Sequence, residues 1–314
     1  MTALNEYTYL SANGKSNIYT RELSPQDAPR GIIQICHGLA EHIVRYDEFA
    51  EFLCSHGFLV AGNDHLGHGR TAMESGDFGF ISEFRGWDMA VYDVRKLTEL
   101  LSGRYPDVPV FLFGHSMGSF LARTYMIRYK TGLDGVMLSG TGHQPRPLLN
   151  AGLSIVRVEE KMRGSRYHSK PITKITSDFR NRPEWEGGRH DWVTRDKSVA
   201  DAYSKDELSG HNPTISMMRD IFWGMKYNSQ GKNLKKMNKD VPVYMFSGER
   251  DPIGMYGRGV MKTYELFLSV GMKDVTMKLY PEGRHEMLNE LNKDEVYADV
   301  HNWIESKMKA AREK

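Results

Sequence analysis

The stretch that decides the fold is Val110–Tyr125, VFLFGHSMGSFLARTY, in which an apolar run ends at Gly-His-Ser-Met-Gly and a helical pattern begins. Residues 110–113 predict a short buried strand, and the apolar residues after the glycines recur at helical spacing. Ser116 lies at the turn, with Gly114 and Gly118 two residues to either side. Small residues let strand and helix approach closely and let a serine adopt a strained backbone conformation. The pattern predicts a nucleophile elbow rather than an ordinary glycine-serine turn.

The composition is that of an ordinary globular protein. Of the 314 residues, 40% are apolar and 26% are charged, and the formal net charge is +2, so nucleic acid is not an expected partner. The basic run Lys232–Lys239, KNLKKMNK, is interpreted as solvated surface. No apolar run reaches the roughly 18 residues that a membrane span needs, so no transmembrane segment is expected.

Two further features predict a cytoplasmic protein. The first residues, MTALNEYTYLSANGKS, lack the basic start and the apolar stretch of a signal peptide. Cys36 lies in an apolar strand pattern and Cys54 in a helical pattern, which predicts two buried, reduced thiols. Neither cysteine has an activating motif beside it, so a thiol nucleophile is not expected.

Patterns that predict strands alternate with patterns that predict helices along most of the chain. This alternation predicts an α/β fold with a mostly parallel central sheet and helices on both faces. The stretch from 143 to 212 interrupts the alternation, and it is too long for a structureless loop. We therefore expect a core formed by residues 1–142 and 213–314, with an inserted cap, or lid, formed by residues 143–212.

A serine hydroxyl needs a neighbouring base, and that base needs an orienting acid. In a parallel sheet such groups are expected in the loops after the carboxyl ends of the strands. Asp251 follows the strand pattern VPVYMFSG, and His285 follows the last strand pattern, VTMKLYPE. The order Ser116, Asp251, His285 is the order of the catalytic triad in α/β-hydrolases. Glu249, two residues before the aspartate, is the main rival for the acid.

The negative charge that develops in such a reaction needs hydrogen-bond donors, which are usually backbone amides. The N–H of Met117 begins the helix after the serine and is expected to be one donor. The other is expected in the loop after the strand GIIQIC, where the backbone N–H of Leu39 follows His37 and Gly38.

Five motifs, taken together, resemble the monoacylglycerol lipase and lysophospholipase branch of the α/β-hydrolase superfamily. They are GHSMG around Ser116, HGLAEH followed shortly by RY, DHLGHG, SGERDP and YPEGRHEMLNE. The resemblance covers residues 31–142 and 241–303 and is weak across the cap, where DWVTRD is the familiar stretch. It implies an α/β-hydrolase fold with a lid and no cofactor. It also implies Ser116 as nucleophile, Asp251 as acid and His285 as base, with Leu39 and Met117 as oxyanion donors. The cap sequence departs from the pattern and leaves the acyl and head-group preference open.

Several histidines outside the expected triad invite comparison with a metal site. They are His37 and His42, with Glu41 between them, and His65 and His68 in NDHLGHG. The spacing does not match an inverted zinc-helix motif, and Gly38 weakens any helix there. We expect these histidines to bond loop backbone, with no metal bound. His115, beside the serine, is expected to point away from the pocket.

The function expected is a serine carboxylester hydrolase that forms an acyl-enzyme on monoacylglycerols, lysophospholipids or related medium-chain esters. One alternative is a serine aminopeptidase of the same fold, which would need an acidic pocket that Glu160, Glu184 or Glu186 of the cap could supply. Another is a binding protein built on the same scaffold without turnover, against which the intact serine, aspartate and histidine speak.

The cap is rich in apolar side chains, most of which are expected to pack it onto the core. They include Leu148, Leu149, Leu153, Ile155, Val156, Met162, Phe179 and Trp185. Trp192, with Met217, Met218 and Phe222 on a predicted helix, is expected to line an acyl pocket, because methionine and aromatic walls suit a flexible chain. The partner expected is a small-molecule ester with an acyl chain, and transient contact with a lipid surface is expected through the cap.

Overall fold

The computed structural model describes residues 2–174 and 190–312, and within them eight strands form one sheet in the order β1-β2-β4-β3-β5-β6-β7-β8. The strands are β1 (Ala3–Leu10), β2 (Asn17–Ser24), β3 (Gly31–Cys36), β4 (Phe58–Asn63), β5 (Val110–His115), β6 (Gly135–Ser139), β7 (Val243–Gly248) and β8 (Val275–Tyr280). Neighbouring strands from β4 to β8 pair in parallel, whereas β1 pairs with β2, and β2 with β4, in antiparallel fashion.

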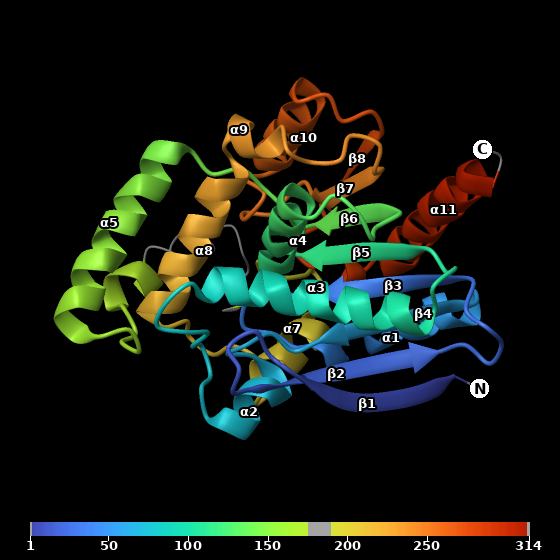
Figure 1. Ribbon diagram of the computed structural model, residues 1–314. Coiled ribbons are helices and arrows are strands. Elements are labelled where there is room, and N and C mark those ends of the chain that lie inside the picture. Colours follow the sequence, from blue (N-terminus) through green and yellow to red (C-terminus); the bar gives the residue numbers. More distant parts are fainter. Residues whose placement is uncertain (1, 175–189, 313–314) are drawn as a thin grey trace.

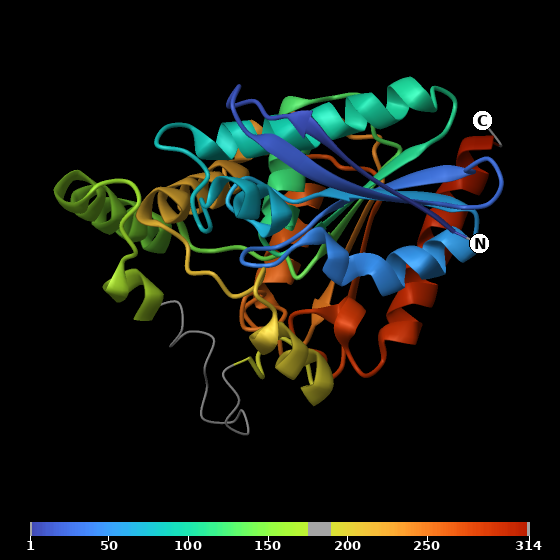
Figure 2. The same cartoon turned by 90° about the horizontal axis from the view of Figure 1, so that it is seen from below.

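Helices cover both faces of this sheet (Figures 1 and 2). One face carries α1 (Asp47–Ser55) and α11 (Lys293–Arg312), and the other carries α3 (Gly86–Arg104), α4 (Met117–Arg128), α8 (Ile215–Asn228) and α10 (Arg258–Ser269). Strand β5 shows why, because Val110 and Leu112 belong to one core cluster and Phe111 and Phe113 to the other. Alternate side chains of a strand point to opposite faces, so a wholly apolar strand requires cover on both.

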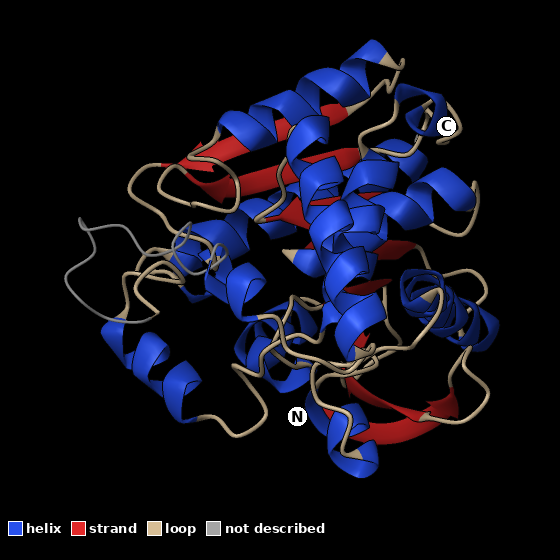
Figure 3. Cartoon of the chain, turned by 90° about the vertical axis from the view of Figure 1, so that its left-hand side faces the viewer, coloured by secondary structure: helices blue, strands red, loops and turns tan. Residues whose placement is uncertain are grey.

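The chain between β6 and β7 lies at the carboxyl edge of the parallel strands. Helix α5 (Arg146–Arg163) packs on α8, and α8 packs in turn on α3 and α4 of the core. The arrows of β5 and β6 point towards this region in Figure 1, and Figure 3 looks onto the same side with helices in front of the sheet. Short elements within the described residues include η1 (Ile43–Tyr46), α2 (Gly69–Ser75), α7 (Lys197–Lys205), α9 (Gly231–Leu234) and η2 (Met287–Asn289).

The predicted fold class is confirmed, and the N-terminal strand β1 begins at Ala3. Most side chains of β1 are exposed because it is an edge strand, so its first residues carry no hydrophobic pattern that a sequence reading can detect. Among the described residues, no helix is long and apolar enough to cross a bilayer.

Candidate active site

The predicted nucleophile elbow is present between β5 and α4. Ser116 has φ 51° and ψ −117°, a conformation that is sterically costly for a residue with a side chain. A Cβ on Gly114 would lie 2.5 Å from the carbonyl oxygen of Gly118, and a Cβ on Gly118 would lie 2.0 Å from that of Cys36. Both glycines are therefore required by close backbone contacts, and this is how strand and helix hold the serine at the turn.

Asp251 and His285 meet at the same edge of the sheet. The Nδ1 of His285 lies 2.9 Å from Oδ1 of Asp251, and both side chains are almost fully buried. The same carboxylate accepts hydrogen bonds from the Ser247 hydroxyl at 2.7 Å and from the Ile253 amide at 2.8 Å. Because three groups donate hydrogen bonds to this carboxylate, its orientation towards the imidazole is fixed.

The electrostatics of the pair favour the two charged forms. Burial opposes ionisation of Asp251, but His285 and the hydrogen bonds from Ser247 and Ile253 hold the pKa of that carboxyl below its usual value. Burial likewise opposes protonation of His285, and the charge of Asp251 outweighs it, with help from Glu286, so that the pKa of the imidazole is raised. A histidine beside a buried carboxylate can take up a proton during a reaction without leaving an uncompensated charge.

The competing assignment for the acid does not fit this geometry. Glu249 is exposed to solvent at the end of β7, whereas Asp251 has no exposed surface. The salt bridge of Arg250 is with Glu282, at 3.2 Å, and not with Asp251.

The loop after β3 lies beside the serine. A Cβ on Gly38 would be 3.1 Å from Cβ of Ser116. The carbonyl oxygen of Gly38 accepts a hydrogen bond from Nδ1 of His37 at 2.8 Å, and its amide donates to Glu41. In a trans peptide the carbonyl and the following N–H point in opposite directions, so this bond turns the N–H of Leu39 away from His37.

Among the described residues, the amides of Leu39 and Met117 near Ser116 make no backbone hydrogen bond, so both are available as donors. The amide of Met117 is unpaired because the first N–H groups of a helix have no partner within it. Both are the residues that the sequence predicts as oxyanion donors, and the loop geometry is compatible with that prediction.

A buried ionic network joins the loop after β3 to the loop of His285. Arg45 donates to both carboxylate oxygens of Glu286, at 2.7 and 2.6 Å, and to Glu41 at 2.8 Å. The Arg45 charge offsets burial and holds the pKa of Glu286 low, at about 2. The ring of Tyr203, from α7, lies 4.7 Å from the guanidinium, and its hydroxyl donates to the carbonyl of Ala40 at 3.0 Å.

Sequence reasoning missed this network, although Glu286 directly follows the predicted base. The available signal was the position of Glu286 next to a histidine expected to be buried, because a buried carboxylate requires a buried counterion. Its partner could not be found from sequence, because Arg45 and Glu286 are 241 positions apart.

His115, which the sequence predicts to point away from the pocket, lies against the proposed base. Its ring centroid lies 4.7 Å from that of His285, and its Nδ1 lies 3.2 Å from the Ser139 hydroxyl on β6. Neighbouring side chains do diverge at the elbow, but His115 is the last residue of β5, and the end of β6 and the His285 loop meet on its side of the sheet. Burial lowers the pKa of His115 to about 3, so this neighbour of the base is neutral.

His37, His65 and His68 form a buried, neutral cluster. His42 does not bond loop backbone as expected, because its Nε2 lies 2.6 Å from Oδ2 of Asp206. The rings of His37 and His65 lie 4.2 Å apart, and His37 accepts the amide of His65 at 3.0 Å through Nε2. His68 bonds the carbonyl of Leu66 through Nδ1 at 3.0 Å. Burial lowers the pKa of His65 to about 3 and that of His68 to about 4. Over the described ranges, no three His, Cys, Asp or Glu side chains are grouped so as to hold a metal ion.

The predicted acyl-pocket residues occupy different places. Trp192 contacts His285, with ring centroids 5.2 Å apart. Met217 and Met218 are buried on α8, and a Cβ on Gly67 would lie 2.8 Å from the methyl of Met217. Phe222 packs on Gly152, between α8 and α5. Of the other apolar cap residues, Leu149, Leu153 and Val156 are buried, Leu148, Ile155 and Met162 are exposed, and Phe179 and Trp185 lie outside the described residues.

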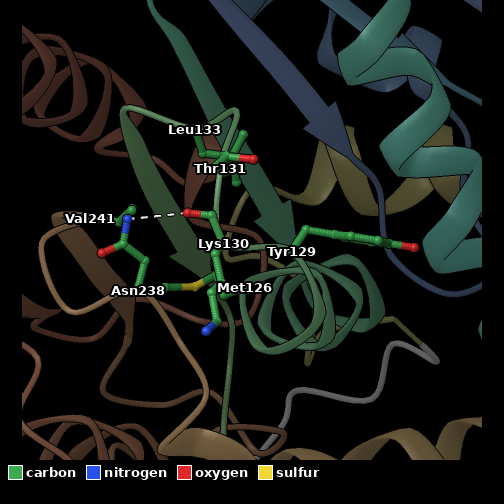
Figure 4. A pocket seen from close by; sticks show the side chains of 7 residues that line it. All are labelled: Met126, Tyr129, Lys130, Thr131, Leu133, Asn238 and Val241. Carbon is green, nitrogen blue, oxygen red and sulfur yellow. Dashed lines mark hydrogen bonds between the residues drawn. The ribbon is translucent and has the colours of Figure 1, made fainter.

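A shallow hollow lies elsewhere on the molecule, at the other end of α4 (Figure 4). Its lining residues are Met126, Tyr129, Lys130, Thr131, Leu133, Asn238 and Val241. It opens near the amino ends of β6 and β7, where the Asn238 amide bonds the Lys130 carbonyl at 3.2 Å. The triad candidates lie at the carboxyl ends, so this hollow is not part of the site.

Comparisons with known proteins agree with the observed fold and extend over nearly the whole chain. The family described as serine aminopeptidase, S33, matches residues 27–292. A monoacylglycerol lipase of Mycolicibacterium smegmatis is 28% identical over 305 residues, covering 96% of this chain and 97% of that protein. A monoglyceride lipase of Mus musculus is 26% identical over 297 residues, covering 94% and 88%. The structure of a carboxyl esterase from Bacillus coagulans, in complex with glycerol, has a TM-score of 0.91 and 29% identity, covering 98% of this chain and 100% of that chain.

A strained serine between a parallel strand and a helix, at the same edge of the sheet as a buried aspartate–histidine pair, is the arrangement of a serine hydrolase of the α/β-hydrolase class. Similarity to lipases and an esterase over nearly the whole chain makes the reaction class ester hydrolysis. The chain belongs to the serine aminopeptidase S33 family, in its monoacylglycerol lipase-like branch.

Proposed function

We propose that Ser116 attacks the carbonyl carbon of an ester while Nε2 of His285 takes the hydroxyl proton. Asp251 orients the imidazole and stabilises its charged form. The protonated His285 then gives its proton to the leaving alcohol, and an acyl-enzyme on Ser116 is left for water to hydrolyse. The observation that carries this proposal is the buried 2.9 Å contact between His285 and Asp251, beside a serine held at φ 51°.

The amides of Leu39 and Met117 are proposed as the oxyanion donors. Both lie next to Ser116 in sequence or space, and neither makes a backbone hydrogen bond among residues 2–174 and 190–312. Amides that are already oriented cost no reorganisation when the oxyanion forms, and for this reason such donors contribute strongly to catalysis.

We propose monoacylglycerols, lysophospholipids or related medium-chain esters as substrates. The printed names of the relatives in Mycolicibacterium smegmatis and Mus musculus support a monoacylglycerol. Residues 143–212 are proposed to form the cap, because the chain leaves the sheet after β6 and α5 packs on α8 above the strand ends. Trp192, Met217, Met218 and Phe222 are the proposed wall of the acyl pocket.

The acidic residues expected to serve an aminopeptidase do not support that alternative within the described residues, although the family description includes it. Glu160, which could have received a substrate ammonium group, is paired with Arg219. Glu184 and Glu186 lie outside the described residues. An aminopeptidase site needs a carboxylate that is available to the substrate, and the described part of the cap offers Glu160 only as half of an ion pair.

We propose that α5 makes transient contact with a lipid surface. An outward-facing stripe of apolar side chains runs along this helix, formed by Leu148, Ile155, Val158 and Met162, which are 58%, 41%, 59% and 74% exposed. Arg157 and Lys161 are also exposed and add positive charge beside the stripe. Such a helix suits the headgroup region of an anionic bilayer, where its apolar face is buried.

A vesicle flotation assay with phosphatidylcholine and phosphatidylglycerol tests this contact. The double substitution Val158→Glu and Met162→Glu should abolish flotation and leave hydrolysis of a water-soluble acetate unchanged. Flotation that persists in the double variant would contradict the proposed contact between α5 and a lipid surface.

A cytoplasmic location is also proposed, and it is supported by the two cysteines, both of which are free and buried.

Labelling with a fluorophosphonate probe, followed by an ester panel, tests the function itself. Wild type should be labelled on Ser116 and should hydrolyse esters with an efficiency that rises from acetate to octanoate, because each buried methylene contributes roughly 0.8 kcal/mol at best. Met218→Ala should reduce activity on octanoate more than on acetate, whereas Met73→Ala, at a residue 66% exposed on α2, should change neither. Faster cleavage of an aminoacyl amide than of any ester would replace the proposal with the peptidase.

A further inference from the structure

The segment around Trp192 lies directly against the loop that carries the proposed base. The amide of His285 donates to the carbonyl of Trp192 at 3.4 Å, and the amide of Glu286 donates to that of Val193 at 2.8 Å. Two consecutive backbone bonds of this kind fix the position of one segment on the other.

Side chains on both segments reinforce the pairing. The guanidinium of Arg284 donates to the carbonyl of Thr194 at 3.0 Å, and the Thr194 hydroxyl donates to the carbonyl of Asn289 at 2.7 Å. Arg195 pairs with the fully buried carboxylate of Glu290 at 2.8 Å. The position of Trp192 is thus determined by the same loop that positions His285.

The indole of Trp192 contacts the imidazole of His285. Their centroids are 5.2 Å apart and their planes make an angle of 35°. A cation near the face of an indole is attracted by the ring's quadrupole, and the attraction strengthens where water is excluded. The imidazole is neutral before it takes the serine proton and positive afterwards, so the indole favours the charged species more than the neutral one.

We propose that Trp192 is a positioning residue of the hydrolase, which stabilises the imidazolium form of His285 through its indole ring and fixes the His285 loop through its carbonyl. The cap then contributes to the chemical step as well as to the acyl pocket. This inference rests on the proposed function of His285 as the base.

Other charged and titratable groups also face the imidazole, and they must stay constant in any test. They are Asp251 from the loop after β7, Glu286 from the base's own loop, Glu41 from the loop after β3, Arg45, which pairs with both glutamates, and His115 at the end of β5. None of them is changed by a substitution at Trp192, so a change in the titration of the base reports on the indole.

The experiment compares Trp192→Phe and Trp192→Leu by the pH dependence of kcat/KM on p-nitrophenyl acetate and octanoate. Leucine keeps apolar bulk beside the imidazole but has no π-face, so we expect a loss of roughly 2- to 30-fold on acetate and a loss at least as large on octanoate, whose chain also meets the proposed acyl wall. The acid limb should move to lower pH by up to about one unit, because the neutral base is then favoured. Phenylalanine should restore most of the activity and most of the limb position.

Two controls make the outcome interpretable. Trp223→Leu removes an indole that stacks on Tyr227 at 5.1 Å, outside the site, and should leave the limb in place. His285→Gln should be inactive, and activity in this variant would reject the proposed base itself. Should Trp192→Leu fail to fold in thermal denaturation, proton NMR titration of the His285 Nδ1–H in Trp192→Met, which also lacks a π-face, gives the same comparison with wild type.

The inference on Trp192 fails, with the base intact, under any of three results. A loss that grows with chain length and leaves the limb unmoved would make Trp192 an acyl-wall residue only. A limb that moves to higher pH would show that the indole acts by excluding water. Unchanged kinetics in Trp192→Leu would show that the ring contact has no part in catalysis.

Discussion

The substitution Asp251→Asn tests the proposed triad most directly, and the structure specifies how the asparagine should sit. Oδ1 of Asp251 accepts from both His285 and the Ile253 amide, whereas Oδ2 accepts from the Ser247 hydroxyl. An amide oxygen at the Oδ1 position keeps the first two bonds. The new NH₂ group then faces Ser247, whose hydroxyl can turn to accept. The asparagine should therefore leave the histidine tautomer intact and remove only the charge.

The cost of losing that charge follows from the 2.9 Å separation of Nδ1 and Oδ1. At an effective dielectric constant of about 20, two unit charges at this distance attract by about 6 kcal/mol. A neutral hydrogen bond from the amide recovers about 1 kcal/mol. The remainder corresponds to a loss in kcat/KM of roughly 10³- to 10⁴-fold.

The pH profile supplies an independent readout of the same substitution. Burial lowers the pKa of His285 and Asp251 raises it, with a net increase. In Asp251→Asn the burial stays and the main opposing charge is gone, so the pKa of the base falls and the acid limb of kcat/KM moves to lower pH. The control is Glu249→Gln, at an exposed residue two positions away, which should keep wild-type kinetics.

The assay is hydrolysis of p-nitrophenyl butyrate from pH 5 to 9, with thermal denaturation to establish that the variant is folded. Retention of a tenth of wild-type kcat/KM, or a large loss without movement of the acid limb, would refute the charge argument. A large loss in Glu249→Gln alone would move the acid to Glu249.

Three further substitutions test other parts of the site. Ser116→Ala should lower kcat by several orders of magnitude, up to about 10⁶-fold, with an unchanged melting temperature, and residual turnover near a tenth would exclude the serine as nucleophile. Gly118→Ala should destabilise the fold by at least about 3 kcal/mol in urea denaturation, because its Cβ would meet a backbone oxygen at 2.0 Å; Gly103→Ala, which meets nothing within 4 Å, should be neutral or slightly stabilising. Arg45→Met should cost about 3–5 kcal/mol at pH 7, because it leaves buried carboxylates without a counterion. The difference in unfolding free energy between wild type and Arg45→Met should shrink as pH falls towards the Glu286 pKa of about 2. The stability that ionised Glu286 contributes is fully present above its pKa in the unfolded chain and is lost when the carboxylate is protonated in the folded protein. An equal cost at all pH values would contradict the ionic explanation.

Much of the fold follows from patterns that are local in sequence. The apolar strands β3, β5 and β7 have only buried residues, and runs of this kind require a sheet covered on both faces. The elbow could be predicted because its requirements, small residues two positions on either side of a serine, are written in consecutive residues. The edge strand β1 shows the limit, since its exposed start carries no such pattern.

Asp251 and His285 were predictable for a different reason. In a parallel sheet the carboxyl ends of the strands share one edge, so polar residues that follow β7 and β8 come together whatever the intervening sequence. The chain order of the three residues narrowed the choice further. This rule does not predict the contacts of His115, because the neighbours of a side chain at the end of a strand depend on which loops pack against that end.

The contacts made by Arg45 and Trp192 were decided by the tertiary structure alone. The arginine pairs with Glu286 across 241 positions, and the indole reaches His285 from the segment between β6 and β7. A sequence shows which residues must leave water, because burial of apolar side chains dominates folding and recurs with the period of a helix or strand. It does not show which partner a buried charge or an aromatic ring finds, because such pairs depend on distances of a few ångströms between loops, and the packing of the whole chain sets those distances.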